Sequence, residues 1–324
     1  MTKIPHDPSF TLEALPPEIS TKLQRQVQGE VLVDVASRGR YATDASIYQQ
    51  FPIAVLIPKS AEDIEIALAI ANESGIPVLP RGGGTSQCGQ TTGTALVIDN
   101  SKHFRKILSS DLSDPDHATV EVEPGMVLDH LNAHLKSYGL WYPVDVSTGA
   151  QATIGGMAGN NSCGSRSIAY GNMVHNVLGI DAWLADGELA NFGAYSESTG
   201  HAKVLGDFVK HLVNDLKPEI EAHWPKVMRR VAGYNLDIFH PQSELPYTQD
   251  GSVNLAHLLV GSEGMLAVIT EVTVKLVPKP QLAQVIMASF DDVEKGGNAV
   301  AAIVAAGIIP AGLEMMDQAA TRAV

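Results

Sequence analysis

The strongest constraint on the fold of this chain is a glycine-rich run that follows directly on a short apolar segment. Residues 78–90 read VLPRGGGTSQCGQ. Three consecutive residues without a Cβ atom let the backbone take positive φ angles and turn its N–H groups inward around an anion. The hydroxyl groups of Thr85 and Ser86 add hydrogen-bond donors. The run therefore predicts a phosphate-binding loop, and a glycine-rich surface turn is the alternative.

Two common phosphate loops differ from this run at decisive positions. A nucleoside-triphosphate loop of the GxxxxGKT type needs lysine where the chain has Gln90. A dinucleotide fingerprint of the GxGxxG type needs glycine where the chain has Gln87, with a helix opening directly afterwards. Residues 94–99 (TALVID) instead predict a strand. We therefore expect a strand, a glycine loop and a second strand.

A second segment with hardly any bulky side chains lies further along the chain. Residues 148–164 read TGAQATIGGMAGNNSCG, and Pro143 fixes the backbone shortly before them. Both segments carry side chains that donate hydrogen bonds. Two such segments in one chain predict an extended ligand that lies between them.

These two segments, followed by GSEG at residues 261–264, give the chain a specific resemblance. In this order they resemble the FAD-binding domain of the vanillyl-alcohol oxidase and p-cresol methylhydroxylase family, over roughly residues 47–280. Within that family the chain is most similar to the D-lactate and glycolate dehydrogenase branch. The resemblance implies an α+β, two-subdomain PCMH-type FAD-binding fold. A small βαβ subdomain and a larger, mainly antiparallel sheet with helices would be followed by the start of an α/β cap domain.

The resemblance also implies where FAD is held. The first loop would surround the pyrophosphate, residues 148–164 would run beside the ribityl chain and isoalloxazine ring, and residues 263–269 would line the adenine or ribityl side. Met265 departs from the family motif, which usually has threonine there. No histidine lies between Arg81 and Asp99, and we expect non-covalent FAD. The implied cofactor-binding residues are Pro80, Arg81, Gly82, Gly83, Gly84, Thr85, Ser86, Gly89, Gln90, Pro143, Thr148, Gly149, Thr153, Ile154, Gly155, Gly156, Ala158, Asn160, Asn161, Gly164, Glu263, Gly264 and Ile269.

The pattern of expected elements divides the chain further. Strands at 54–57 and 76–79 enclose a helix that begins after Ser60 and ends at Gly75, which gives a βαβ unit leading into the first loop. The expected divisions are an N-terminal arm (1–46), a FAD-binding domain (47–280) with a first subdomain (47–103) and a second subdomain (104–280), a helical insertion at about 200–235, and an incomplete substrate or cap domain (281–324).

The second subdomain and the C-terminal part have their own patterns. Alternating residues at 120–125 and 272–277 predict strands with one solvated face. From Gln284 onward the pattern predicts a strand, a helix at 293–306, a strand at 309–314 and a final helix that stops without a cap. We interpret this part as half of a domain. The helical insertion carries an apolar stripe that is expected to face the core: Leu205, Phe208, Val209, Leu212 and Leu216.

The resemblance implies a reaction and its partners. We expect FAD-dependent oxidation of a small D-2-hydroxy acid, such as D-lactate or glycolate, by hydride transfer to the flavin. The base and metal-binding histidines of the family would lie beyond Val324, so we expect the isolated chain to bind FAD weakly and to turn over little lactate. An iron–sulfur domain or subunit is the candidate electron acceptor. Alternatives are a non-catalytic flavin-binding subunit or fragment of a larger flavin and iron–sulfur complex, a reductase of cell-wall precursors and a degenerate nucleotide triphosphatase.

Charge and hydropathy exclude several other classes. A formal net charge of −14 argues against nucleic acid or an acidic membrane surface as a partner. The longest apolar run, residues 299–309, is too short to span a bilayer, and the first residues lack the apolar core of a signal peptide. We expect a cytoplasmic protein without a transmembrane segment, or one held at the inner membrane by partners.

Two histidines and two cysteines have simple interpretations. His130 and His134 are four residues apart, but the stretch lacks the glutamate of an HExxH site, so we expect an exposed helix face and no metal. Cys88 and Cys163 are the only cysteines, and a disulfide between them is not expected. Because CxxC spacing is absent, an iron–sulfur cluster would have to be held elsewhere.

Two sites near the loops have open interpretations. Arg166 and Tyr170 follow the second segment, and they could face a substrate carboxylate or hold the loop in place. Arg229 and Arg230 could reach the flavin edge, but a solvated helix end is the simpler interpretation.

Overall fold

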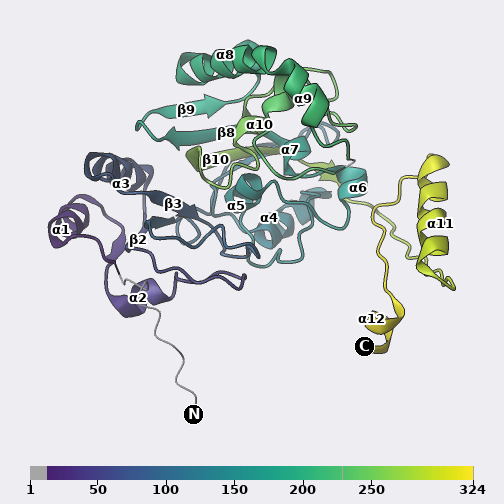
Figure 1. The fold of residues 1–324 in the computed structure, drawn as a ribbon, viewed down its shortest axis with the longest axis horizontal. Coiled ribbons are helices and arrows are strands. Elements are labelled where there is room, and N and C mark those ends of the chain that lie inside the picture. Colours follow the sequence, from purple (N-terminus) through teal and green to yellow (C-terminus); the bar gives the residue numbers. More distant parts are fainter. Residues whose placement is uncertain (1–12, 228, 324) are drawn as a thin grey trace.

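The structure is a computed structural model that describes residues 13–227 and 229–323. Its helices and strands are grouped around two sheets, which confirms the α+β class expected from the sequence. Figure 1 shows the last two helices, α11 (Val293–Ala305) and α12 (Gln318–Ala323), set apart from the rest of the chain. Among the described residues, the structure contains no helix that is long and apolar enough to cross a membrane.

The first sheet has four strands in the order β1-β2-β4-β3. The strands β2 (Ala54–Ile57), β4 (Leu96–Asp99) and β3 (Val78–Arg81) are parallel, and β1 (Glu30–Leu32) pairs antiparallel to β2. β2 occupies the residues expected for it, and β3 begins two residues later than expected. Residues 82–95 join β3 to β4 without a helix, so the predicted strand, glycine loop and strand are confirmed.

Local signals in the sequence fix the helix between β2 and β3. The hydroxyl oxygen of Ser60 accepts a hydrogen bond from the Asp63 backbone N–H at 3.3 Å and caps α3 (Ala61–Ser74). Gly75 ends the helix in the left-handed conformation, with φ of 64°. The expected βαβ unit is therefore confirmed. The buried face of α3 contains Asp63, Ile64, Ala67, Leu68, Ile70 and Ala71.

The segment expected to be an N-terminal arm is built into this first body. Helix α1 (Pro17–Gln26) packs on α3, and the next segment supplies β1. In α2 (Val35–Gly39), the Arg38 side chain is buried and donates to the Pro52 carbonyl oxygen at 2.9 Å. Residues 1–12 of the expected arm lie outside the described residues.

The second sheet has five antiparallel strands, as the sequence predicts for the larger subdomain. Its order is β5-β6-β10-β8-β9. Along β6, β8 and β10, alternating apolar residues are buried on one face, and polar residues of the same strands are partly solvated. The strands are β5 (Ile107–Asp111), β6 (Thr119–Val122), β8 (Val177–Leu184), β9 (Leu189–Phe192) and β10 (Ala267–Lys275).

Short helices cover the buried face of this sheet and form the main core with it. Two of their leucines, Leu131 and Leu135, are fully buried. A small two-stranded sheet pairs β7 (Leu140–Trp141) with β11 (Val277–Pro278). The helices are α4 (Leu128–Leu135), α5 (Ile154–Asn160), α6 (Ser167–Tyr170), α7 (Met173–Asn176) and α10 (Ala256–Leu259).

The helical insertion is present, and its expected stripe faces the core only in part: Leu205 and Val209 pack against the core, whereas Phe208 and Leu216 are exposed. The insertion consists of α8 (Gly200–Asp215) and α9 (Lys217–His223). Phe208 is 64% exposed. The helix instead turns its small residues inward, since a Cβ atom added at Gly206 would lie 2.9 Å from Leu255 Cδ1. The buried face of α8 thus centres on Ala202, Gly206 and Val213, and only part of the apolar stripe contacts the core.

The C-terminal part contains the expected helix but not the expected strands. Helix α11 forms almost over the predicted residues, whereas no strand forms from Gln284 or at 309–314. A strand needs a neighbouring strand to satisfy its backbone N–H and C=O groups, and none of the described strands pairs with these residues. Their side chains are correspondingly exposed, with Val285 at 96% and Ile309 at 72%.

We predict that Asp63→Ala destabilises the first body. The Asp63 carboxylate accepts hydrogen bonds from the backbone N–H groups of Gln28 and Lys59, both at 2.7 Å, and it is 1% exposed. Losing it leaves two donors without their acceptor, so the free energy of unfolding should fall by about 2–3 kcal/mol in a urea titration. The exposed neighbour Glu65 provides the control, because Glu65→Ala should change it by no more than about 0.5 kcal/mol. Equal effects of both substitutions would contradict the role of Asp63.

Candidate functional site

The two glycine-rich segments meet in the structure. A Cβ atom added at Gly82 would lie 2.2 Å from Thr153 Oγ1, and one added at Gly83 would lie 2.2 Å from the Gln151 carbonyl oxygen. These two glycines therefore let the backbones of the segments touch. Gly83 and Gly156 are both exposed on the joined surface.

The third motif joins the same place. The Glu263 backbone N–H donates to the Gly159 carbonyl oxygen at 2.8 Å. Gly264 has φ of 75°, and a Cβ atom there would lie 2.8 Å from Pro80 Cγ. The GSEG turn is thus wedged between the end of β3 and the end of α5. All three motifs that carry the family resemblance form one continuous surface.

A hydrogen-bonded junction at Glu263 ties the three motifs together. Its Oε1 atom accepts from Asn160 Nδ2 at 2.9 Å and from Gln90 Nε2 at 3.4 Å. Ser86 donates to the Gln90 side-chain oxygen, and Ser162 donates to that of Asn160 at 3.0 Å. Burial raises the pKa of Glu263 above its ordinary value. Gln90, which stands in place of a phosphate-binding lysine, is therefore a bridge between motifs.

Arg81 is held by backbone groups beside the first loop. Its guanidinium donates to the carbonyl oxygens of Tyr41 at 3.1 Å, Thr91 at 3.0 Å and Thr43 at 2.9 Å. Burial lowers its pKa. These bonds fix the shape of the loop. The predicted pyrophosphate contacts would then come from backbone N–H groups and from the hydroxyls of the loop.

Residues 41–48 form a wall of the site that the sequence analysis missed. The Ala45 backbone N–H donates to the Gly84 carbonyl oxygen at 3.1 Å, and Thr91 Oγ1 donates to Asp44 Oδ2 at 3.0 Å. A Cβ atom at Gly89 would lie 2.7 Å from Tyr48 Cδ2. This stretch has neither glycine clustering nor a motif, so its only signal was its position just before β2.

The second segment contains a helix where the sequence suggested a loop. Helix α5 begins after Thr153, whose hydroxyl accepts from the Gly156 N–H at 3.4 Å, and ends at Asn161 with φ of 51°. The Asn161 side chain is buried, accepts from the Val174 N–H at 3.0 Å and donates to the Val231 carbonyl oxygen at 3.3 Å. Asn161 therefore holds neighbouring segments together.

The predicted cofactor residues differ in their access to solvent. The side chains of Ile154, Ala158 and Ile269 belong to the main core, and the three residues are buried. The buried members are Pro143, Gly149, Thr153, Ile154, Gly155, Ala158, Asn161 and Ile269. The half-buried members are Pro80, Arg81, Gly82, Gly84, Thr85, Ser86, Gly89, Gln90, Thr148, Asn160, Gly164, Glu263 and Gly264. Their contacts with a cofactor stay predictions.

Arg166 and Tyr170 hold the exit of the second segment. Arg166 Nε lies 3.3 Å from Asp145 Oδ2, and its guanidinium lies 5.0 Å from the centre of the Trp141 ring. The Tyr170 ring packs edge-on against the same tryptophan at 5.5 Å. These contacts favour the interpretation that Arg166 anchors the loop.

Arg230 does not lie at a solvated helix end, as the simpler interpretation had it. Its side chain is 12% exposed, lies over the Trp224 ring and sits 3.5 Å from the fully buried Asp237 carboxylate. The solvated interpretation fails because α9 ends at His223 and the following segment folds back onto the body. Arg229 is exposed.

The remaining titratable candidates lie where the sequence analysis expected them. His130 and His134 are exposed on α4. Cys88 is exposed and Cys163 is half-buried, and both are free thiols.

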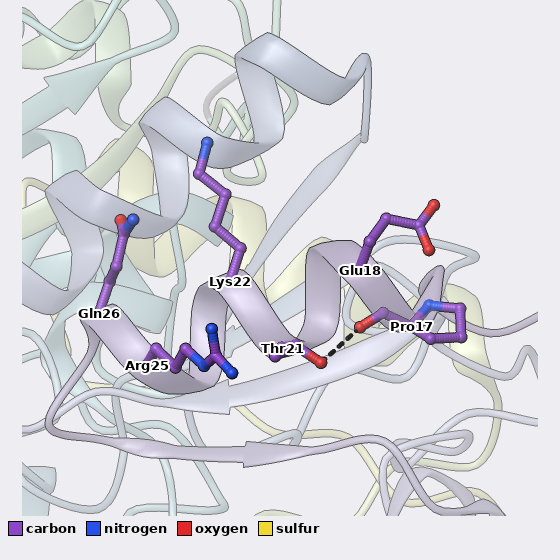
Figure 2. A pocket seen from close by; sticks show the side chains of 6 residues that line it. All are labelled: Pro17, Glu18, Thr21, Lys22, Arg25 and Gln26. Carbon is purple, nitrogen blue, oxygen red and sulfur yellow. Dashed lines mark hydrogen bonds between the residues drawn. The ribbon is translucent and has the colours of Figure 1, made fainter.

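A surface depression on α1 is separate from this site. Figure 2 shows that the side chains lining it all come from that one helix, with Thr21 Oγ1 donating to the Pro17 carbonyl oxygen at 2.7 Å. Lys22 extends to Glu73 on α3. A hollow formed by one amphipathic helix encloses little, and it shares no residue with the three motifs. It is lined by Pro17, Glu18, Thr21, Lys22, Arg25 and Gln26.

Comparisons with known proteins place this geometry in a family. An FAD binding domain matches residues 52–193, and the C-terminal domain of FAD linked oxidases matches residues 279–324. The chain is 34% identical over 299 residues to glycolate oxidase subunit GlcD of Bacillus subtilis, covering 90% of this chain and 52% of that protein. It is 32% identical over 274 residues to D-2-hydroxyglutarate dehydrogenase of Pantoea ananatis, covering 81% of this chain and 26% of that protein.

The chain belongs to the FAD-linked oxidase family. Its cofactor is FAD. A solved structure of alkyldihydroxyacetonephosphate synthase matches with a TM-score of 0.63 at 18% identity, over 96% of this chain and 48% of that one. This likeness supports the fold alone. The chain spans about half the length of the glycolate oxidase subunit and a smaller share of the dehydrogenase.

The residues of this chain fit a diphosphate-bearing cofactor. At Gly156 an added Cβ atom would approach only the hydroxyl of its own helix cap, Thr153, at 3.1 Å, so the exposed side of this glycine is open. The half-buried hydroxyls of Thr85 and Ser86 lie in the adjoining loop. Backbone N–H groups and hydroxyls at an open glycine surface are suitable donors for an anion.

We predict that Gly83→Ala separates the two segments. The new methyl group would lie 2.2 Å from the Gln151 carbonyl oxygen, a backbone atom, so one segment has to move. The free energy of unfolding should fall by about 1–3 kcal/mol, measured by urea titration, and FAD should bind more weakly in a fluorescence titration. The control is Gly297→Ala in α11, where an added Cβ atom meets nothing within 4 Å. Unchanged stability and FAD binding of the Gly83 variant would contradict the close contact.

Proposed function

We propose that the chain holds FAD non-covalently on the surface formed by its three glycine-rich motifs and oxidises a small D-2-hydroxy acid. The observation that carries the proposal is the junction at Glu263, because it joins all three motifs that the cofactor would need. The glycolate oxidase subunit and the D-2-hydroxyglutarate dehydrogenase support the substrate class, since both names refer to small 2-hydroxy acids.

The chain's own residues have distinct parts in this proposal. Backbone N–H groups of residues 82–86 and the hydroxyls of Thr85 and Ser86 hold the diphosphate. Arg81 keeps the loop in shape through its three backbone carbonyl partners. The open side of Gly156 gives the rest of the cofactor access to α5. When bound, FAD supplies a two-electron acceptor, and the protein supplies placement and electrostatics.

The same proposal includes the cellular compartment and the electron acceptor. We place the protein in the cytoplasm, where free thiols such as those of Cys88 and Cys163 persist. An iron–sulfur domain or subunit is the proposed electron acceptor, which remains a prediction from the family resemblance.

We predict that the purified 324-residue chain is yellow. Its visible absorbance should be that of oxidised flavin, and acid precipitation should leave the flavin in the supernatant because no covalent link is expected. High-performance liquid chromatography of the supernatant should identify FAD. A colourless protein that also binds no added FAD would contradict the proposal, and colour retained in the pellet would contradict non-covalent attachment.

One observation favours a second function, that of a flavin-binding component of a larger assembly. Several apolar side chains of the C-terminal part are almost fully exposed, including Leu282 at 88%, Val285 at 96% and Ile286 at 90%. Exposed apolar clusters of this kind are typical of surfaces that another polypeptide covers. In this function the chain holds FAD, and its turnover depends on the covering polypeptide.

The two functions differ in what a substrate does to the yellow colour. Under anaerobic conditions, D-lactate, glycolate or D-2-hydroxyglutarate should bleach the flavin of a self-sufficient dehydrogenase, with L-lactate as the stereochemical control. Stopped-flow absorbance measures this directly. Bleaching by a D-2-hydroxy acid supports the dehydrogenase. A stable yellow chain that none of these acids bleaches supports the flavin-binding component.

A further inference from the structure

The junction at Glu263 uses only one of the two carboxylate oxygens. Both amide donors, Asn160 Nδ2 and Gln90 Nε2, are directed at Oε1. No described residue forms a hydrogen bond to Oε2, and this atom is not among the fully buried polar atoms that lack a partner. Oε2 is therefore accessible to solvent or to a ligand at the meeting point of the three motifs.

The carboxylate has no cation to neutralise it. Burial is the largest influence on Glu263 and disfavours its charged form, and the only opposing influences are the two neutral amides. The charged or titratable groups on the elements packed against it are Arg81, Cys88, Cys163, Arg166, Arg229 and Arg230. None of them contributes to its shift, and Arg81, Arg166 and Arg230 have partners of their own in Tyr41, Asp145 and Asp237.

An anion bound at these loops would raise the free-energy cost of keeping the Glu263 carboxylate charged, because no cation neutralises it. Like charges at close quarters in a partly desolvated site disfavour ionisation. Protonating Oε2 removes the repulsion without breaking the junction, because Oε1 keeps both amide donors. The new O–H group can then donate a hydrogen bond to a ligand oxygen.

We propose that Glu263 takes up one proton at Oε2 when the diphosphate of FAD binds, so that cofactor binding and protonation of this junction are coupled. The inference rests on the proposed function. The proton comes from solvent, and the only bond formed in the step is O–H at Oε2. Glu263 is thus a positioning residue with a titratable function, beyond its structural role in joining the motifs.

The direction of the pH effect follows from this coupling. Binding that raises the pKa of a carboxyl group is stronger at low pH, where the group is already protonated in the free protein. FAD affinity should therefore rise as pH falls through the interval between the pKa of free and bound protein, both above the ordinary value of 4.5. One coupled proton limits the change to about tenfold per pH unit.

The test measures FAD binding to the full chain by isothermal titration calorimetry and by flavin fluorescence, at pH values between about 5.5 and about 8. Affinity should rise about three- to tenfold toward the lower pH, and titrations in buffers of different ionisation enthalpy should report uptake of up to one proton. Riboflavin, which has no diphosphate, should bind without proton uptake. In Glu263→Gln, which keeps an acceptor oxygen but cannot titrate, both the pH dependence and the proton uptake should be lost.

A matched control separates this effect from general charge changes. Glu271 on β10 is also half-buried with a pKa raised by burial, but its neighbours are Asp181 and Glu121 on the second sheet. Glu271→Gln should therefore keep the wild-type pH dependence. If wild-type chain binds FAD without proton uptake, or if Glu263→Gln keeps the pH dependence, this inference is overturned and the proposed function stands. If wild-type chain binds no FAD at any pH, both are overturned. The wild-type calorimetry decides the matter even if the variant fails to fold.

Discussion

The close contact between the backbones at Gly82–Gly83 and Gln151–Thr153 is the constraint on which the site depends. It brings together two segments that lie about 70 residues apart in the sequence, one directly after β3 and the other directly before α5. A side chain at either glycine would meet atoms at 2.2 Å, so no other residue type allows the same approach. Once the segments touch, the GSEG turn fits between them and Glu263 can reach an amide from each. The geometry of the junction is therefore a consequence of two missing Cβ atoms.

The cation of the first loop is held by backbone groups beside that loop. Three backbone carbonyl groups and the Tyr41 ring surround the guanidinium of Arg81, and Asp99 accepts from the Tyr41 hydroxyl at 2.7 Å. The charged guanidinium of Arg81 thereby fixes the shape of the loop. What remains at the surface is a set of neutral donors and one half-buried carboxylate, Glu263. In the proposed function, such a site recognises an anion through oriented dipoles, and its local charge changes by one proton.

The sequence predicted features that depend on local signals and failed where a feature depends on distant neighbours. Ser60 and Gly75 cap their helix through bonds within a few residues, so the helix could be predicted. The alternation of apolar and polar residues along β10 indicates which face is buried, so this strand could be predicted as well. The glycine clusters were identified, but the sequence suggested that they make room for a ligand, whereas Gly82 and Gly83 first make room for another loop. The wall at residues 41–48 and the inward glycine face of α8 at Gly206 arise from tertiary packing that leaves no pattern in the sequence.

The exposed C-terminal part contacts the body near the site. A Cβ atom added at Gly312 would lie 2.7 Å from the Ser165 carbonyl oxygen, so the segment touches the body directly after the second glycine-rich segment. Burying one large aliphatic side chain stabilises by about 1.5–3 kcal/mol, and Leu282, Val285 and Ile286 are each at least 88% exposed. A surface that covers these residues would therefore bind with a large hydrophobic contribution.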